Sequence, residues 1–290
     1  MEKFEIIEKR LLAPNIVLMK VYAPRIAQSA KPGQFLIVIV DDKSERIPLT
    51  ICDFDASEGT ITIVTQSIGA STIRIVNMNV GQCFHNFAGP LGHPSELIEF
   101  NDQEIQESNV VFVAGGLGAA PVYPQVKYLA SRGAKPHVIL GAKSENFLIM
   151  EKEFRALTPN VHIATDDGSA GFHGLVTDLL KQLTDAGEKF SLAVAIGPMI
   201  MMKFVALTTK QLGVKTIVSL NTMMVDGTGM CGACRVTVAG KTRFACVEGP
   251  EFDGHEVDFD EALRRGGMYR TIEARKKERE EQNHKCNIGM

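Results

Sequence analysis

The sequence has few of the features that mark membrane-bound or nucleic-acid-binding proteins. Its longest purely apolar run, residues 35–40, is about a third of the roughly 18 residues that cross a bilayer, and the first ten residues lack an apolar signal core. Thirty-one basic against 34 acidic side chains leave a net charge of −3, which gives no general attraction for nucleic acid or an anionic membrane. We therefore expect a cytoplasmic protein that recognises its partners locally.

Cysteine is also scarce, since six in 290 residues are too few for a disulfide-dense secreted protein. Three of the six, Cys231, Cys234 and Cys246, nevertheless fall within 16 positions. In a reducing compartment this clustering points to a metal or cluster site before it points to disulfides.

The chain is too long for one ordinary domain, and its apolar fraction of 45% is enough to bury sizeable cores. Within residues 1–100, short apolar segments with alternating character are broken by turn residues, which predicts an antiparallel β-barrel or sandwich. The turn formers of residues 89–93 are expected to end this part. The expected strands are residues 4–12, 16–23, 33–40, 46–55 and 59–66.

Residues 101–222 alternate between short apolar strands and amphipathic helices of about 10 to 15 residues. This alternation predicts a doubly wound, parallel α/β sheet, whose ligands bind at the carboxyl ends of the strands. The expected strands are residues 110–115, 136–141, 161–167, 192–197 and 216–221, and the expected helices are 122–133, 146–157, 174–183 and 199–213.

The chain changes character again after residue 222. Residues 223–262 hold a glycine- and cysteine-rich loop and a hairpin that turns at Gly240, and residues 263–290 form a charged tail, expected to be a solvated helix. Cys52 and Cys83 are expected to be buried thiols. Cys286 could meet a partner subunit, although a frayed tail is the simpler interpretation. The seven histidines show no metal-binding spacing.

One glycine-rich loop follows the first strand of the α/β part and precedes a helix. Its bare amides and the helix N-terminus can bind a pyrophosphate, although proline stands where the dinucleotide fingerprint has its third glycine. A purely structural turn remains the alternative. The candidate residues are Gly115, Gly116, Gly118, Ala120 and Pro121.

Two further strand ends carry candidate nucleotide-binding residues. Asp166 and Asp167, with Gly168 and Ser169, could bind ribose hydroxyls but would repel a 2′-phosphate, which favours NAD over NADP. A solvated turn is equally compatible with these residue types. Gly197, Pro198 and Met199 occupy the third strand end, where a core and turn role is the simpler interpretation of the residues alone.

The strongest pattern is Asp226-x4-Cys231-x2-Cys234-x11-Cys246. Its x4 and x2 spacing is that of a plant-type [2Fe-2S] loop, with aspartate in the first ligand position. The glycines of the loop allow a tight fold that presents amides to sulfur. A zinc ion held by the three thiolates with Asp226 or His255, or three thiols without metal, are the alternatives left open.

Taken together, the order of barrel, dinucleotide domain and [2Fe-2S] loop resembles the ferredoxin–NADP reductase superfamily, in particular the electron-transfer subunit of dihydroorotate dehydrogenase. The resemblance implies bound FAD, NAD(H) and a [2Fe-2S] cluster, with Thr50 near the flavin N5 and NAD at the three strand-end loops. It implies that the flavin is held by Arg46, Ile47, Pro48, Leu49 and Thr50, by Val64, Thr65 and Gln66, and by Gly69, Ser71 and Thr72.

Asp226 in place of the fourth cysteine, and the tail, depart from the dihydroorotate dehydrogenase subunit. Both are similar to the small subunit of the NADH-dependent reduced ferredoxin:NADP oxidoreductases, electron-bifurcating enzymes also described as sulfide dehydrogenases. This resemblance implies a relay from NADH through FAD to the cluster and on to a large iron–sulfur flavoprotein partner. A dihydroorotate or sulfide dehydrogenase partner, and a zinc-held protein-binding module, are the rival hypotheses.

Overall fold

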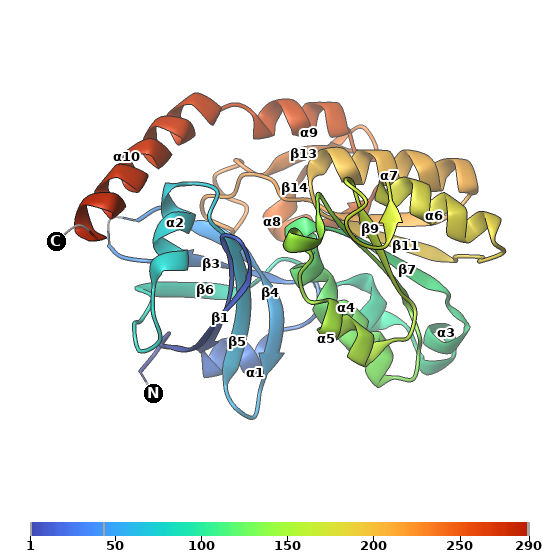
Figure 1. Ribbon diagram of the computed structural model, residues 1–290, viewed down its shortest axis with the longest axis horizontal. Coiled ribbons are helices and arrows are strands. Elements are labelled where there is room, and N and C mark those ends of the chain that lie inside the picture. The colour runs from blue at the N-terminus through green and yellow to red at the C-terminus, as the bar shows by residue number, and fades with distance from the viewer. Residues whose placement is uncertain (1, 43, 289–290) are drawn as a thin grey trace.

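The computed structural model describes the backbone of residues 2–42 and 44–288 and the side chains of these residues up to 282. The earlier prediction for Cys286 therefore lies outside the described side chains. Two large parts lie side by side, and the C-terminal helices run across the top of both (Figure 1). No helix in the described ranges combines the length and apolar character needed to span a bilayer.

The first part is the predicted antiparallel barrel-like sheet, whose six described strands have the order β1-β2-β5-β4-β3-β6. Its inner face is a core of aliphatic side chains with Phe84 and Phe87. Two short helices, α1 (Pro24–Ser29) and α2 (Ala70–Asn77), flank it. The strands are β1 (Ile6–Ala13), β2 (Ile16–Tyr22), β3 (Phe35–Ile39), β4 (Ile47–Asp55), β5 (Thr60–Gln66) and β6 (Asn86–Leu91).

Strand β6 corrects one sequence prediction. Gly89, Pro90 and Leu91 were expected to be turn residues but lie in this strand, which pairs with β3. Because β6 is the last strand in this order, one of its sides has no neighbouring strand. Pro90 has no backbone N–H, and on that unpaired side its absence removes no hydrogen bond from the sheet. Cys52 is buried as expected, whereas Cys83 is only half-buried, so that prediction was wrong.

The second part contains the predicted parallel sheet, with the order β10-β9-β8-β7-β11-β12-β15. Its central strands are buried along their whole length because helices cover both faces. The strands are β7 (Val110–Gly115), β8 (His137–Ala142), β9 (Val161–Thr165), β10 (Phe172–His173), β11 (Leu192–Ile196), β12 (Lys215–Ser219) and β15 (Glu251–Asp253). The helices are α3 (Asp102–Glu107), α4 (Ala119–Ser131), α5 (Glu151–Leu157), α6 (Val176–Asp185) and α7 (Met199–Leu212), with short 3-10 turns η1 (Glu96–Glu99), η2 (Gly116–Gly118) and η3 (Glu145–Phe147).

Strand β15 comes from the segment after the cysteine loop and pairs antiparallel with β12. The expected five-stranded sheet is thus extended at one edge by the C-terminal segment and at the other by β10. The predicted hairpin is present, with Ala239 and Gly240 in left-handed conformation at its turn. The remaining elements are β13 (Arg235–Val238), β14 (Lys241–Phe244), α8 (Ala245–Glu248), α9 (Phe259–Gly266) and α10 (Arg270–Ile288).

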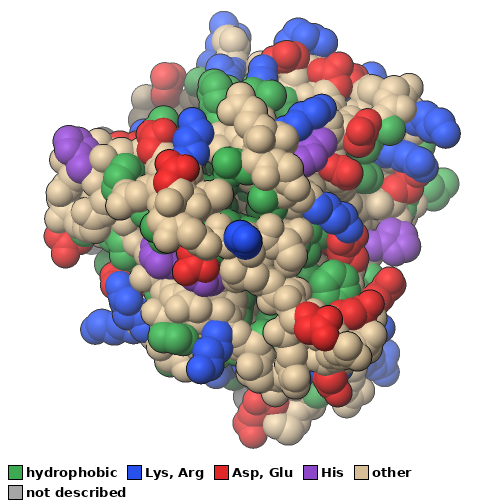
Figure 2. Space-filling view, turned by 90° about the vertical axis from the view of Figure 1, so that its right-hand side faces the viewer, with side chains coloured by type: hydrophobic (Ala, Val, Ile, Leu, Met, Phe, Trp, Pro, Cys, Tyr) green, Lys and Arg blue, Asp and Glu red, His purple; other side chains and the backbone are tan. Residues whose placement is uncertain are grey.

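The barrel packs against helix α4. Ile16, Cys52 and Val64 of the barrel share one core with Val122 and Val126 of α4, and Lys127 pairs with Asp53 at 2.8 Å beside this contact. The two parts therefore form a continuous apolar interface. On the face that Figure 1 shows at its right, basic and acidic side chains are interspersed rather than gathered by sign (Figure 2).

Candidate functional site

The glycine-rich loop lies at the carboxyl end of β7, beside the end of β11. A Cβ on Gly118 would overlap the carbonyl oxygen of Ile196, and a Cβ on Gly197 would lie 3.0 Å from the Gly115 amide nitrogen. The Met201 side chain packs against Gly115 and Gly197. These close approaches explain why glycine is required at Gly118 and Gly197, and they join two predicted loops into one edge.

Helix α4 begins directly after this loop. Ala120 and Pro121 lie in its first turn, and both are buried. The 13-residue helix turns its N-terminal amides toward the strand ends, the arrangement that binds phosphate groups. The predicted pyrophosphate residues are therefore brought together.

The acidic turn lies at the end of β9, two strands away from β7. Asp167 accepts hydrogen bonds from the Ser169 amide (2.9 Å) and hydroxyl (2.6 Å), and these bonds lower the pKa of its carboxyl group. Asp166 and Gly168 are exposed at the same edge. The turn has the hydrogen bonds of the solvated-turn alternative, and it also lies at the strand-end edge where the ligands of such sheets bind.

The predicted flavin residues lie on adjoining strands of the barrel. Ile47, Pro48, Leu49 and Thr50 lie in the first half of β4, where Thr50 is half-buried opposite Phe35 of β3. Val64, Thr65 and Gln66 end the neighbouring strand β5. The Thr65 hydroxyl is buried and has no hydrogen-bond partner among the described residues, so it is available to a bound ligand.

The third predicted flavin segment is the start of α2. The Thr72 hydroxyl accepts a hydrogen bond from the Gly69 amide at 2.9 Å, which shapes the helix start. Ser71 donates to Glu45 at 2.6 Å, and bonds from Lys276 and Ser71 lower the pKa of the Glu45 carboxyl group. A carboxylate thus lies against the hydroxyl of a residue predicted to hold the flavin, and no sequence pattern indicated this contact.

The cysteine loop brings two of its four predicted ligands together. The sulfurs of Cys234 and Cys246 are buried 3.3 Å apart and form no disulfide. Two thiolates that bind one metal ion at about 2.3 Å each lie within about 4.6 Å of one another, so this pair fits one iron of a cluster. Burial raises the pKa of Cys246 to about 12, and the Cys234 thiol adds to the shift. Metal binding would therefore release protons.

Asp226 and Cys231 lie on the exposed side of the same loop. The Asp226 carboxylate accepts hydrogen bonds from the amides of Thr228 and Cys231, both at 2.8 Å, and these lower its pKa. Cys231 is exposed. In the part of the chain that the structure describes, no three His, Cys, Asp or Glu side chains are close enough to hold one metal ion. Asp226, Cys231 and Cys234 lie in the loop and Cys246 lies in α8, and the four side chains do not form one coordination sphere.

The zinc alternative loses one of its two possible fourth ligands. His255 lies 3.2 Å from the Thr209 hydroxyl of α7, and its segment packs on that helix. A zinc site would have to rely on Asp226 with the three thiols.

The cysteine loop contacts the predicted flavin segment directly. The Arg46 guanidinium donates to the Asp226 carbonyl oxygen at 3.4 Å, and a Cβ on Gly227 would lie 2.6 Å from Ile37 of β3. Phe35 and Ile37 share one apolar cluster with Cys234 and Cys246. Flavin and iron–sulfur residues far apart in sequence are thus neighbours in the fold.

The sequence analysis did not identify several polar residues that the structure places near the candidate site. Asn221 and Thr222 follow β12, and the strand-end rule applied to the other loops could have found them. Arg270, at the start of α10, sits among many charged residues, and no sequence signal distinguishes it. The buried carboxyl oxygen of Glu251 on β15 also had no signal.

Comparison with known proteins identifies the family. Residues 221–258 match the family model of the iron–sulfur cluster binding domain of dihydroorotate dehydrogenase B. A Thermotoga maritima homologue of the dihydroorotate dehydrogenase B (NAD(+)) electron transfer subunit is 43% identical, over 93% of this chain and 92% of its own length. The chain belongs to the family of these electron-transfer subunits.

Two further relatives extend the comparison. An uncharacterized Clostridium beijerinckii protein is 52% identical over 94% of this chain and 92% of its own. A solved chain of the NADH-dependent reduced ferredoxin–NADP oxidoreductase, from work on flavin-based electron bifurcation, is 41% identical with a TM-score of 0.88, covering 96% of this chain and 98% of that one.

Membership of the family confirms the predicted fold class. It also confirms the prediction that the chain is an oxidoreductase subunit that acts with a partner. The predicted cofactors, FAD, NAD(H) and a [2Fe-2S] cluster, are those of the family. The roles of individual site residues remain predictions.

Proposed function

We propose that this chain is the NAD(H)-linked electron-transfer subunit of an electron-bifurcating NADH-dependent reduced ferredoxin–NADP oxidoreductase. In this role it exchanges electrons between NAD(H), FAD, a [2Fe-2S] cluster and a large iron–sulfur flavoprotein subunit. The observation that carries the proposal is the similarity to that enzyme's chain over 96% of this chain. Asp226 in the first ligand position supports it.

The cofactors supply the electron chemistry, because a flavin can take a hydride pair from NADH and pass single electrons to an iron–sulfur cluster. The chain's own residues supply position and burial. The edge formed by Gly115, Gly118 and Gly197 would hold the nucleotide, and Thr50 would face the flavin ring. The contact between Arg46 and the Asp226 carbonyl keeps the flavin segment beside the cysteine loop.

Asp226, Cys231, Cys234 and Cys246 are the proposed cluster ligands. The buried Cys234–Cys246 pair would provide the inner attachment, and Cys231 with Asp226 the exposed one. The exposed ligands would face the partner, so that an electron could leave the chain there. No side chain of this site is required to act as an acid or a base.

A second candidate is the electron-transfer subunit of a dihydroorotate dehydrogenase. It is favoured by the match of the cysteine segment to that family model and by the similarity to the Thermotoga maritima homologue of the dihydroorotate dehydrogenase B electron transfer subunit. In that case the partner would be a flavin-bearing barrel rather than an iron–sulfur flavoprotein. A sulfide dehydrogenase partner would require the same local chemistry of this chain.

The test is to purify the native complex and identify the chain that co-purifies. A large subunit with its own flavin and two four-iron clusters is the expected result, and a dihydroorotate-oxidising barrel would replace the proposal by the second candidate. The visible spectrum of the isolated chain should show oxidised flavin with broad iron–sulfur absorption that NADH bleaches. A colourless, zinc-containing chain would instead support a protein-binding module.

A further inference from the structure

The C-terminal helices join the two parts of the molecule. Helix α9 is held to α7 by the Lys203–Asp260 ion pair at 2.6 Å, and α10 is held to α2 of the barrel by Arg74–Glu280 at 2.8 Å. Figure 1 shows these helices crossing above the space between barrel and parallel sheet. The tail is a helix, as predicted, but it also spans the two parts instead of extending freely into solvent.

A cavity of about 500 Å³ lies under the corner where α9 passes into α10. Its other walls come from the Pro198–Met199 turn at the start of α7, from Asn221 and Thr222 after β12, and from β13. The cavity is as large as those that bind cofactors and small molecules. Because Pro198 and Met199 belong to the predicted nucleotide edge, the cavity adjoins the proposed NAD(H) site.

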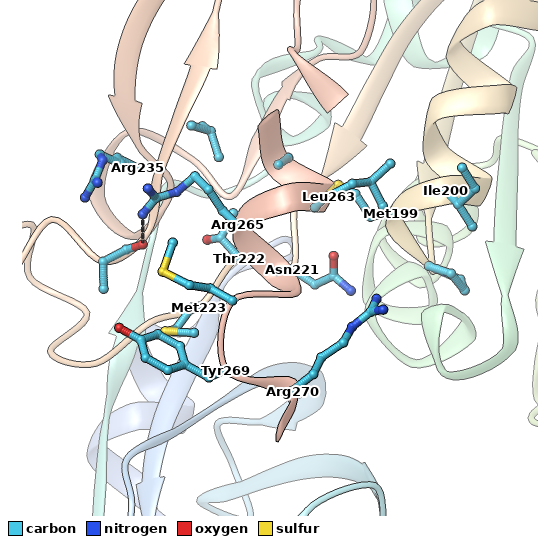
Figure 3. A pocket seen from close by; sticks show the side chains of 16 residues that line it. Met199, Ile200, Asn221, Thr222, Met223, Arg235, Leu263, Arg265, Tyr269 and Arg270 are labelled. Carbon is cyan, nitrogen blue, oxygen red and sulfur yellow. Dashed lines mark hydrogen bonds between the residues drawn. The ribbon is translucent and has the colours of Figure 1, made fainter. Parts of the chain in front are cut away.

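The charged residues that line the cavity are all basic. Arg235, Arg265 and Arg270 are among the 16 lining residues, and none of the 16 is acidic. Arg265 and Arg235 each donate to a backbone carbonyl oxygen. The Arg270 guanidinium makes no hydrogen bond or ion pair with any described residue, and Figure 3 shows it reaching toward Asn221. An unpaired guanidinium in an acid-free cavity is suited to a phosphate or carboxylate.

One further polar group in the cavity wall lacks a partner. The Thr222 hydroxyl oxygen is buried and has no hydrogen-bond partner among the described residues. Met223 and the ring of Tyr269 provide apolar surface in the same cavity (Figure 3), and Met268 also lines it. The cavity thus combines a cationic group and apolar side chains with an unpartnered hydroxyl in its wall, which is a combination that suits a nucleotide.

We propose that the Met268–Arg270 corner is part of the nicotinamide-nucleotide site, with Arg270 binding a phosphate oxygen on the nicotinamide half of NADH. The proposal rests on the proposed function, since it takes NADH as the substrate. The N-terminus of α7, a 14-residue helix, adds favourable potential for the anion from the opposite wall. The tail therefore has a role in substrate binding as well as in joining the two parts.

The test compares Arg270→Ala, Arg270→Lys and the control Arg275→Ala in the flavin-loaded complex at one salt concentration. Arg275 is exposed on the same helix and does not line the cavity. Calorimetric titration with NAD+ should show about tenfold weaker binding for Arg270→Ala, partial recovery for lysine and no change for the control. The KM for NADH should rise with little change in kcat.

Nicotinamide mononucleotide and AMP separate the two halves of the ligand. Arg270→Ala should weaken binding of the first and leave the second unchanged. Wild-type affinity of Arg270→Ala for both NAD+ and nicotinamide mononucleotide would overturn the inference, as would a loss confined to AMP. A wild-type complex that NADH fails to reduce would instead contradict the proposed function.

Discussion

The strand-end edge and the cysteine loop are built in different ways. At the edge, Gly115, Gly118 and Gly197 place main-chain atoms against one another in a fully buried sheet. In the cysteine loop, the proposed ligands are side chains on a segment where Cys231 is exposed and Cys234 is buried. Main-chain geometry is set by strand packing, whereas side-chain ligands also depend on rotamers and on the loop's own hydrogen bonds.

This difference indicates which kind of substitution should damage each site. A small volume change should damage the edge, because packed backbone has no room to move. The cysteine loop should tolerate changes of shape and respond instead to changes in the chemistry of its ligands.

The largest expected effect is that of Gly118→Ala. The new methyl group would overlap the Ile196 carbonyl, and backbone on both sides limits relaxation. We expect a loss of about 3 kcal/mol in the free energy of unfolding, with loss of NADH binding. Urea denaturation and NAD+ titration measure both.

Gly266→Ala is the matched control for stability alone, because a Cβ there meets no atom within 4 Å, whereas Gly266 itself lines the cavity under α9. Gly266 ends helix α9, so alanine should leave stability unchanged or raise it by up to about 1 kcal/mol. If Gly118→Ala and Gly266→Ala had equal free energies of unfolding, the close approach of Gly118 to Ile196 would not constrain the edge.

Glu251 lies where the cysteine segment joins the parallel sheet, because its strand β15 follows the cysteine loop in sequence and pairs with β12. Its Oε2 is buried with no hydrogen-bond partner among the described residues, Gln125 donates to Oε1 at 2.6 Å, and burial raises the pKa of its carboxyl group to about 7. Between pH 4.5 and 7 the folded state binds more protons than the unfolded chain. Stability should therefore fall by up to about 3 kcal/mol as pH rises through this window, and then level off.

Glu251→Gln should remove this pH dependence, because a neutral amide has no proton to release. Urea denaturation at pH 5 and pH 8 should show a smaller difference for the variant than for the wild type, with the variant more stable at pH 8. Glu256→Gln, at an exposed position, is the control and should keep the wild-type slope. Parallel curves for wild type and Glu251→Gln would refute the linkage.

Asp226→Cys probes the cysteine loop through ligand chemistry. If Asp226 binds iron, a thiolate in its place should retain the cluster and shift its midpoint potential, on the order of 100 mV. Redox titration with iron analysis measures both. Asp226→Asn is the companion variant, since it keeps the acceptor for the Cys231 amide. An unchanged potential in Asp226→Cys would assign the aspartate to loop structure alone.

The sequence was sufficient for features that depend on periodicity and spacing. Alternation predicted the barrel strands, buried apolar runs predicted the parallel strands, and glycines after strands predicted the edge where the loops meet. The cysteine spacing predicted the loop that matches an iron–sulfur domain model. Each of these signals is local, so a single segment is enough to show it.

Features that join distant segments could not be predicted in this way. Strand β15 extends a sheet whose other strands end more than 30 residues earlier, because Phe252 and its neighbours pair with β12 across the intervening loop. Arg270 gains its position only from the way α9 and α10 cross the molecule. Pro90 was predicted as a turn residue because the sequence cannot show that its strand lies at a sheet edge.

The smallest expected effect concerns nucleotide choice at the acidic turn. Asp167 is exposed and charged, held by Ser169 at the edge that would receive the ribose. Asp167→Arg should weaken NADH binding and spare or improve NADPH binding, shifting the ratio of the two affinities by about tenfold. Asp185→Arg, at the exposed C-terminal end of α6, is a control with the same change of charge. If Asp167→Arg weakens both nucleotides equally, the aspartate only shapes its turn, and the preference for NAD must come from another part of the edge.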